Sequence, residues 1–116
     1  MKHRAFETCR LGIAVVALAL LASMPARAED SFTVHITLKD NRFQPAEPTA
    51  PAKKAITIVV KNLNAAPAEF ESNMLRVEKV VVAGGTITMR IRPLEPGRYR
   101  FFDDFHPSTE GYLVVK

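Results

Sequence analysis

From residue 32 onward, apolar and polar side chains alternate along the chain with the two-residue period of a β-strand. Residues 32–39 (FTVHITLK) place an apolar side chain at every second position and a polar one between. Because successive side chains of a strand point to opposite faces, this stretch is expected to be a half-buried strand. Residues 55–61 (AITIVVK), rich in β-branched side chains, predict a second strand, which the turn-forming residues 62–67 end.

The rest of the chain continues as short extended stretches separated by turn signals. Strands are expected at 69–71, 77–82, 86–91, 99–102 and 112–115. Three prolines between positions 45 and 51 exclude a helix there, and residues 72–76 are the one place where a helical turn is expected. Roughly seven short strands joined by turns predict an all-β fold, a small Greek-key β-sandwich.

The first 28 residues follow a different pattern. A basic stretch precedes an uninterrupted apolar run of 12 residues, 11–22, and Ala26-Arg27-Ala28 ends the segment in the small-x-small form that signal peptidase cleaves. Residues 1–28 are therefore expected to be a cleaved secretory signal peptide, and residues 29–116 one domain in the periplasm. The run is shorter than the roughly 18 residues of a membrane-spanning helix. Cys9 precedes this run, whereas a lipidated cysteine follows it, so no membrane anchor is expected after processing.

Removal of the signal peptide changes the charge and cysteine content. The formal net charge falls from +4 to +1, because residues 1–28 contain four Lys or Arg and one Glu. A domain this close to neutrality lacks the excess positive charge that nucleic-acid binding requires. Cys9 is the only cysteine, so the mature chain contains none. This excludes disulfides, cysteine nucleophiles and thiolate metal sites.

Two acidic clusters interrupt the strand pattern. In the first, Glu69 and Glu71 are two positions apart on an expected strand and therefore share a face. The second, Asp103-Asp104-Phe105-His106, lies between the last two expected strands. Carboxylates and a neutral imidazole are typical ligands of iron, manganese, zinc and divalent copper. The alternatives are a solvated strand edge for the first cluster and an ordinary acidic turn for the second.

The second cluster belongs to a longer motif with a family resemblance. Residues 97–115 (GRYRFFDDFHPSTEGYLVV) resemble the C-terminal signature of cupredoxins, in which G-x-Y-x-F-x-C precedes a histidine-bearing loop and a G-x-L-x-V strand. The turn at Asn62 followed by EFE falls where cupredoxins place their N-terminal histidine ligand. Three segments show a narrower similarity, to the cupredoxin-like domains of bacterial periplasmic iron-uptake systems of the Efe and Ftr kinds. They are EFES, the L-x-x-EK of residues 75–79, and LEPGRYRFFDDFHP.

The resemblance implies a cupredoxin-like fold over essentially the whole mature chain and a site without type 1 copper. Asp103 stands at the position of the copper-binding cysteine, and a type 1 centre needs that thiolate. His106 is the one position that matches a copper ligand. The iron-uptake relatives imply a carboxylate-rich site for iron and/or copper ions, with these candidate ligands: Glu69, Glu71, Glu78, Asp103, Asp104 and His106.

The function implied by this resemblance is support of ferrous-iron uptake in the periplasm. The domain would bind the ion and either present it to a membrane permease or oxidise it first, with an iron permease and other periplasmic uptake components as partners. Hard oxygen ligands stabilise Fe(III) over Fe(II), which favours oxidation but does not require turnover. Two alternatives remain open, a copper-binding carrier in copper homeostasis and a docking module whose acidic loop binds no metal.

Overall fold

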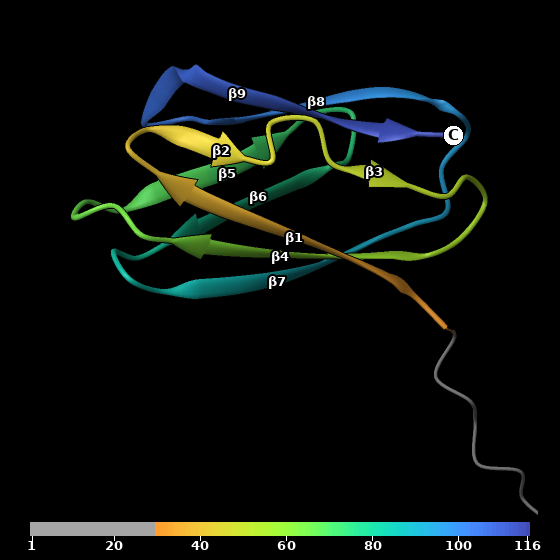
Figure 1. Cartoon of the computed structure of the whole chain (residues 1–116), viewed down its shortest axis with the longest axis horizontal. Coiled ribbons are helices and arrows are strands. Elements are labelled where there is room, and N and C mark those ends of the chain that lie inside the picture. The colour runs from red at the N-terminus through yellow and green to blue at the C-terminus, as the bar shows by residue number, and fades with distance from the viewer. Residues whose placement is uncertain (1–29) are drawn as a thin grey trace, which may run out of the picture.

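Residues 30–116, which a computed structural model describes, form a sandwich of two β-sheets (Figure 1). The expected signal peptide lies outside these residues. The described part of the chain contains no helix with the length and apolar character needed to cross a membrane.

The first sheet contains four strands in the order β2 (Arg42–Gln44), β1 (Phe32–Lys39), β4 (Ile56–Asn62) and β7 (Thr86–Ile91). The β1 and β4 strands run parallel, and the other two pairs are antiparallel. As the alternation along residues 32–39 predicts, Val34, Ile36 and Leu38 are buried and the polar side chains between them face outward.

The second sheet contains five strands in the order β3 (Thr49–Ala50), β9 (His106–Val115), β8 (Gly97–Asp103), β5 (Ala68–Ser72) and β6 (Val77–Val81). The β3–β9 pair is parallel and the other pairs are antiparallel. The all-β sandwich expected from the sequence is confirmed. The helical turn expected at residues 72–76 was wrong, since Ser72 ends β5 and a non-helical turn follows.

Two parts of the sandwich differ from the strands expected from the sequence. The short strand β2 precedes the proline-rich segment and β3 lies within it, and neither strand was expected. The last strand, β9, begins at His106, six residues before the expected start at residue 112, so the link after β8 is a tight turn of residues 104–105. The register between β8 and β9 shifts at Phe102/Asp103, which lets His106 pair with Asp103.

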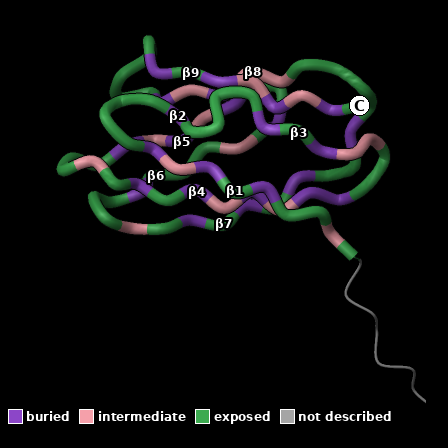
Figure 2. The backbone as a smooth tube through the Cα atoms, viewed as in Figure 1, coloured by how far each residue is buried: buried purple, intermediate pink, exposed green. Residues whose placement is uncertain are grey.

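The core lies between the two sheets, where the buried positions of both face each other (Figure 2). Phe101 stacks on Phe70 with 5.1 Å between ring centroids, and Phe43 meets Phe101 edge-on at 5.0 Å. Four turns, β1–β2, β4–β5, β6–β7 and β8–β9, lie together at the same end of the sandwich (Figure 1). Both acidic clusters lie near this turn end, because β5 begins after the β4–β5 turn and Asp104 belongs to the β8–β9 turn.

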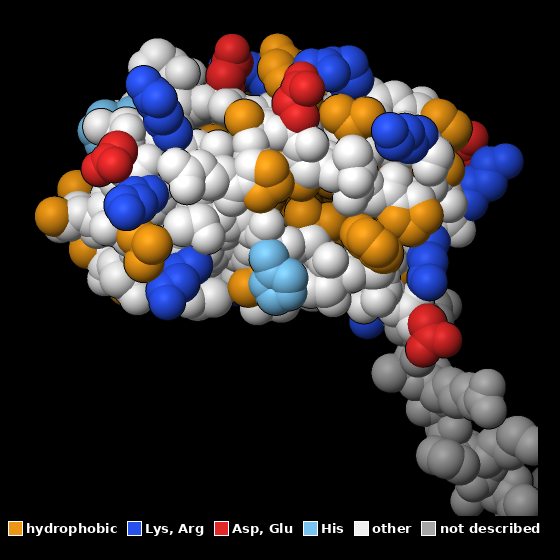
Figure 3. All heavy atoms as spheres, viewed as in Figure 1, with side chains coloured by type: hydrophobic (Ala, Val, Ile, Leu, Met, Phe, Trp, Pro, Cys, Tyr) orange, Lys and Arg blue, Asp and Glu red, His pale blue; other side chains and the backbone are white. Residues whose placement is uncertain are grey.

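Charges of both signs are mixed on the surface. On the face shown in Figure 3, Lys and Arg side chains are interspersed with Asp and Glu among the described residues. This distribution fits the small net charge of the expected mature chain. It offers no large basic area on that face to neutralise phosphates.

Candidate metal site

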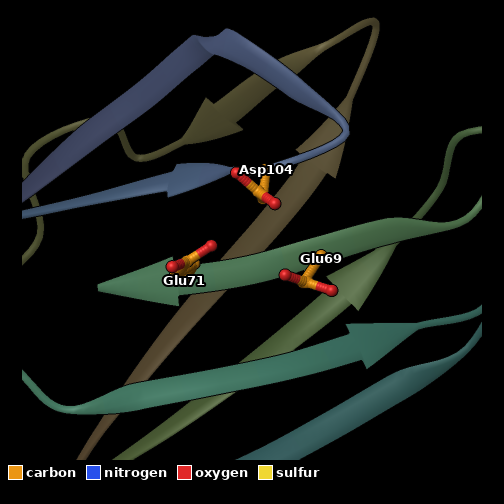
Figure 4. Close-up of side chains that lie close together, drawn as sticks. All are labelled: Glu69, Glu71 and Asp104. Carbon is orange, nitrogen blue, oxygen red and sulfur yellow. The ribbon is translucent and has the colours of Figure 1, made fainter. Parts of the chain in front are cut away.

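Three carboxylates converge on the outer face of the second sheet near the turn end. Glu69 and Glu71 come from β5 and Asp104 from the β8–β9 turn, and one oxygen from each lies within 4.8 Å of the others (Figure 4). We call these three side chains the carboxylate cluster. Phe70 is buried between the two glutamates, so strand alternation turns both of them outward. Glu78 on β6 lies directly opposite Glu71 in the sheet.

Hydrogen bonds donated by backbone N–H groups hold the β8–β9 turn against β5. The Asp104 N–H donates to the Glu69 carbonyl oxygen at 2.9 Å. The Glu69 N–H in turn donates to Oδ1 of Asp103 at 3.0 Å, and the Phe105 N–H donates to the same oxygen at 3.0 Å. These contacts place the Asp104 carboxylate beside the two glutamates, 33 residues and more away in sequence.

The carboxylate cluster carries uncompensated negative charge. Partial burial, followed by a hydrogen bond with the Glu78 side chain, raises the pKa of Glu69, and the nearby charges of Asp104 and Glu71 act in the same direction. Partial burial also raises the pKa of Glu71, with the charges of Asp104 and Glu78 adding to the effect. None of the ion pairs within residues 30–116 includes a member of the cluster. A bound cation would relieve this repulsion.

Asp103 and His106 form a separate pair next to the carboxylate cluster. The Asp103 side chain is only 2% exposed and lies opposite Phe70 in the sheet, whereas Asp104 is exposed. His106 Nδ1 lies 3.1 Å from Asp103 Oδ2, and the histidine side chain is 47% exposed. Glu69 therefore meets Asp103 through its backbone N–H and not through its carboxylate.

The structure thus brings together some of the six candidate ligands and separates others. Glu69, Glu71 and Asp104 converge, with Glu78 beside them. Asp103 and His106 are not part of the convergent set among the described residues. Phe102, one of the aromatics beside the second acidic cluster, pairs with Glu71 in the sheet, and the Arg100 guanidinium lies 4.4 Å from the centroid of its ring. Arg100 also pairs with Glu110 at 2.6 Å.

The donor set does not fit a type 1 copper centre. Such a centre needs a cysteine thiolate together with imidazole ligands. Residues 30–116 contain no cysteine, because Cys9 is the only one in the chain. The side chains at the turn end offer carboxylate oxygens and the imidazole of His106, a combination suited to harder or borderline ions.

The missing thiolate predicts the spectrum of the copper-loaded protein. We expect residues 29–116 loaded with Cu(II) to show only weak visible absorption, because oxygen and nitrogen ligands give no intense thiolate-to-copper band. Visible absorption and electron paramagnetic resonance spectra of the purified domain measure this directly. An intense blue colour would contradict the assignment of donors.

The two mixed sheets and the turn end that carries the candidate site define a cupredoxin-like β-sandwich. Residues 12–115 match the family described as "Cupredoxin-like domain", and the chain belongs to this family. It is 32% identical over 109 residues to an uncharacterized protein of Rickettsia prowazekii (strain Madrid E), covering 92% of this chain and 87% of that protein.

Solved structures share the fold at low sequence identity. One is the metal-binding domain of the Cu(I)-exporting P-type ATPase CopA of Streptococcus pneumoniae, solved with Cu(I), with a TM-score of 0.63 and 17% identity over 72% of this chain and 84% of that one. Another is auracyanin A, a blue copper protein from Chloroflexus aurantiacus, with a TM-score of 0.63 and 17% identity over 75% of this chain and 100% of that one. They confirm the cupredoxin-like fold, and the narrower resemblance to iron-uptake domains stays a prediction.

Proposed function

We propose that this protein is a periplasmic metal-binding protein that binds iron and/or copper through the carboxylate cluster and supports ferrous-iron uptake through a membrane permease. The observation that carries the proposal is the convergence of Glu69, Glu71 and Asp104 within 4.8 Å, with no Lys or Arg paired to them among the described residues. Converging oxygen donors with uncompensated charge suit a hard cation.

The oxygen donors of the cluster favour one oxidation state of iron over the other. Carboxylates stabilise Fe(III) more than Fe(II), so the cluster lowers the reduction potential of the iron it holds. Oxidation of bound Fe(II) releases one electron, so turnover requires an acceptor among the other uptake components. Binding and presentation of the ion to the permease require no such acceptor.

The experiment that tests this proposal combines metal binding with growth. The metal-free domain is offered Fe(II), Mn(II), Zn(II) or Cu(II) in separate samples without oxygen, because equal competition favours Cu(II) at most nitrogen and oxygen sites, and bound metal is quantified after gel filtration. We expect iron to be retained through the cluster, so that Glu71→Gln loses it while Glu95→Gln, a change at an exposed carboxylate outside the cluster, does not.

The growth arm uses the same two variants. Deletion of the gene should slow growth under ferrous-iron limitation, and the wild-type gene and Glu95→Gln should restore growth whereas Glu71→Gln should not. Growth that is untouched by iron limitation but sensitive to copper would contradict the iron-uptake proposal. Circular dichroism shows that each variant is folded.

A copper carrier is the second candidate function, and the exposed imidazole of His106 favours it. Divalent copper binds well to mixed nitrogen and oxygen donors, and His106 lies beside the turn that carries Asp104. Two of the structural neighbours also bind copper. Retention of Cu(II) that is lost in His106→Ala, together with copper sensitivity of the deletion strain and undisturbed growth under iron limitation, would establish this function in place of iron uptake.

A further inference from the structure

We propose that Asp103 is a positioning residue and not a metal ligand. It holds the β8–β9 turn against β5, so that Asp104 meets the two glutamates, and it fixes which nitrogen His106 offers to a metal. The inference deepens the proposed function and rests on it for its metal-binding measurements, although two of the measurements below need no metal.

The first argument is that the Asp103 carboxylate is already occupied. Oδ1 accepts the N–H groups of Glu69 and Phe105, and Oδ2 lies 3.1 Å from His106 Nδ1. The side chain is buried and lies on the core side with Phe70. A metal ion at Asp103 would have to displace these partners and enter the core. Asp104, by contrast, is exposed and contributes an oxygen to the cluster.

The second argument is the identity of the two backbone donors. Glu69 belongs to β5 and Phe105 to the β8–β9 turn, so one carboxylate oxygen joins the two segments that carry the cluster. Asp104 lies between Asp103 and Phe105, and its N–H is bonded to the Glu69 carbonyl oxygen. Loss of the Asp103 oxygen would leave two part-buried N–H groups without an acceptor and free the turn to move away from β5.

The third argument concerns the tautomer of His106. A carboxylate is purely an acceptor, so the hydrogen bond to Asp103 requires the proton on Nδ1 of the neutral imidazole. Nε2 then keeps its lone pair on a side chain that is 47% exposed. A hydrogen bond of this kind sets both the ring orientation and the tautomer of a metal-binding histidine. Any ion held by His106 would therefore bind Nε2.

Paired substitutions at neighbouring positions separate positioning from ligation. In Asp103→Asn, the amide oxygen can still accept the N–H groups of Glu69 and Phe105, but the amide nitrogen donates toward His106 Nδ1 and reverses the tautomer. Asp103→Ala removes both functions. Asp104→Asn and Asp104→Ala are the matched controls, since the side chain of Asp104 makes no comparable bonds to the turn.

In the metal-free protein, we expect amide hydrogen exchange at Glu69 and Phe105 to accelerate in Asp103→Ala and to stay close to wild type in Asp103→Asn and both Asp104 variants. Nitrogen-15 shifts of His106 should show the proton on Nδ1 in wild type and on Nε2 in Asp103→Asn. Unchanged exchange in a folded Asp103→Ala, or an unchanged tautomer in Asp103→Asn, would overturn the inference. If Asp103→Ala does not fold, the tautomer and iron affinity of Asp103→Asn decide.

Anaerobic calorimetric titration with Fe(II) measures the metal affinity of each variant. Asp103→Ala should lose about 10- to 100-fold in affinity, as for other residues that position ligands. Asp103→Asn should lose only about threefold in affinity, because the change removes one negative charge near the ion and keeps the turn in place. Asp104→Asn and Asp104→Ala should lose as much affinity as each other, about 100-fold, because both remove the ligand oxygen. Equal large losses in Asp103→Asn and Asp103→Ala would make Asp103 a ligand and overturn the inference. If wild type binds no iron, the proposed function fails, and the exchange and tautomer measurements decide the inference.

Discussion

Replacing Glu69 and Asp104 together by their amides is expected to weaken iron binding by more than either single change, yet by less than the two single losses combined. Each single change, Glu69→Gln or Asp104→Asn, should lower affinity by about 100-fold, at least the loss typical of residues that only support ligands. The double variant should lose less binding free energy than the sum of the singles, because oxygens within 4.8 Å of one another share one ion. Anaerobic calorimetric titration with Fe(II) measures all three losses.

Amides keep the shape of the carboxylates, so these changes test charge and ligation more than packing. Glu95→Gln, at an exposed position outside the cluster, is the matched control and should bind like wild type. Small losses that add up would show that Glu69 and Asp104 do not share an ion.

The metal-free forms of the same variants supply a second measurement, the dependence of stability on pH. The pKa values of Glu69 and Glu71 are raised in the folded protein, by partial burial first and by neighbouring carboxylates second. A raised carboxyl pKa stabilises the fold fully below the unfolded pKa, about 4.3 for glutamate, and this stabilisation is lost as pH rises through the folded pKa. The melting temperature of wild type should therefore gain less between pH 4 and pH 7 than that of Glu69→Gln.

The pairing of Glu69 with Glu71 could be predicted from the sequence, and the convergence with Asp104 could not. Alternation within one strand places residues 69 and 71 on one face whatever the rest of the fold does. At the end of the next strand in the sheet, the same alternation turns one of the adjacent acids Asp103 and Asp104 inward and the other outward. It does not determine which of the two faces the core. The pairing of Phe70 with Asp103 decides this, and it exists only in the tertiary structure.

The length of β9 was missed for a related reason. Apart from Pro107, positions 106–110 are polar, and all but Thr109 are exposed, so they lack the alternation that marked 112–115 as a strand. His106 and Glu110 pair with Asp103 and Phe102 at the end of β8, and residues 107–109 are the extra residues of the register shift between these two pairs. Hydrogen bonding to a neighbouring strand, not burial, determines this part of the fold, and a pattern of apolar positions cannot report it.

Gly111→Ala is expected to be among the most destabilising single changes in the domain. Gly111 is buried on β9 opposite Phe101, and an added Cβ would lie 2.5 Å from both the Ala46 carbonyl oxygen and Phe101 Cζ. Ala46 cannot withdraw freely, because its oxygen accepts the Tyr112 N–H at 2.8 Å. Overpacking against such neighbours costs about 3 kcal/mol or more, a large share of the roughly 5–15 kcal/mol that stabilises a small domain. Urea denaturation of residues 29–116 measures the loss.

Gly97→Ala is the matched control, because its Cβ would meet only Tyr99 Cε2 at an ordinary 3.5 Å, and it should change stability by less than about 1 kcal/mol. Phe101→Leu should partly rescue Gly111→Ala, since a shorter side chain removes the clash with the ring and leaves the clash with Ala46. Equally small losses of stability in Gly111→Ala and Gly97→Ala would contradict the close packing at Gly111. Phe101 stacks on Phe70, which lies between the two glutamates, so Gly111→Ala should also weaken iron binding. Phe101→Leu should then partly restore stability and iron binding together.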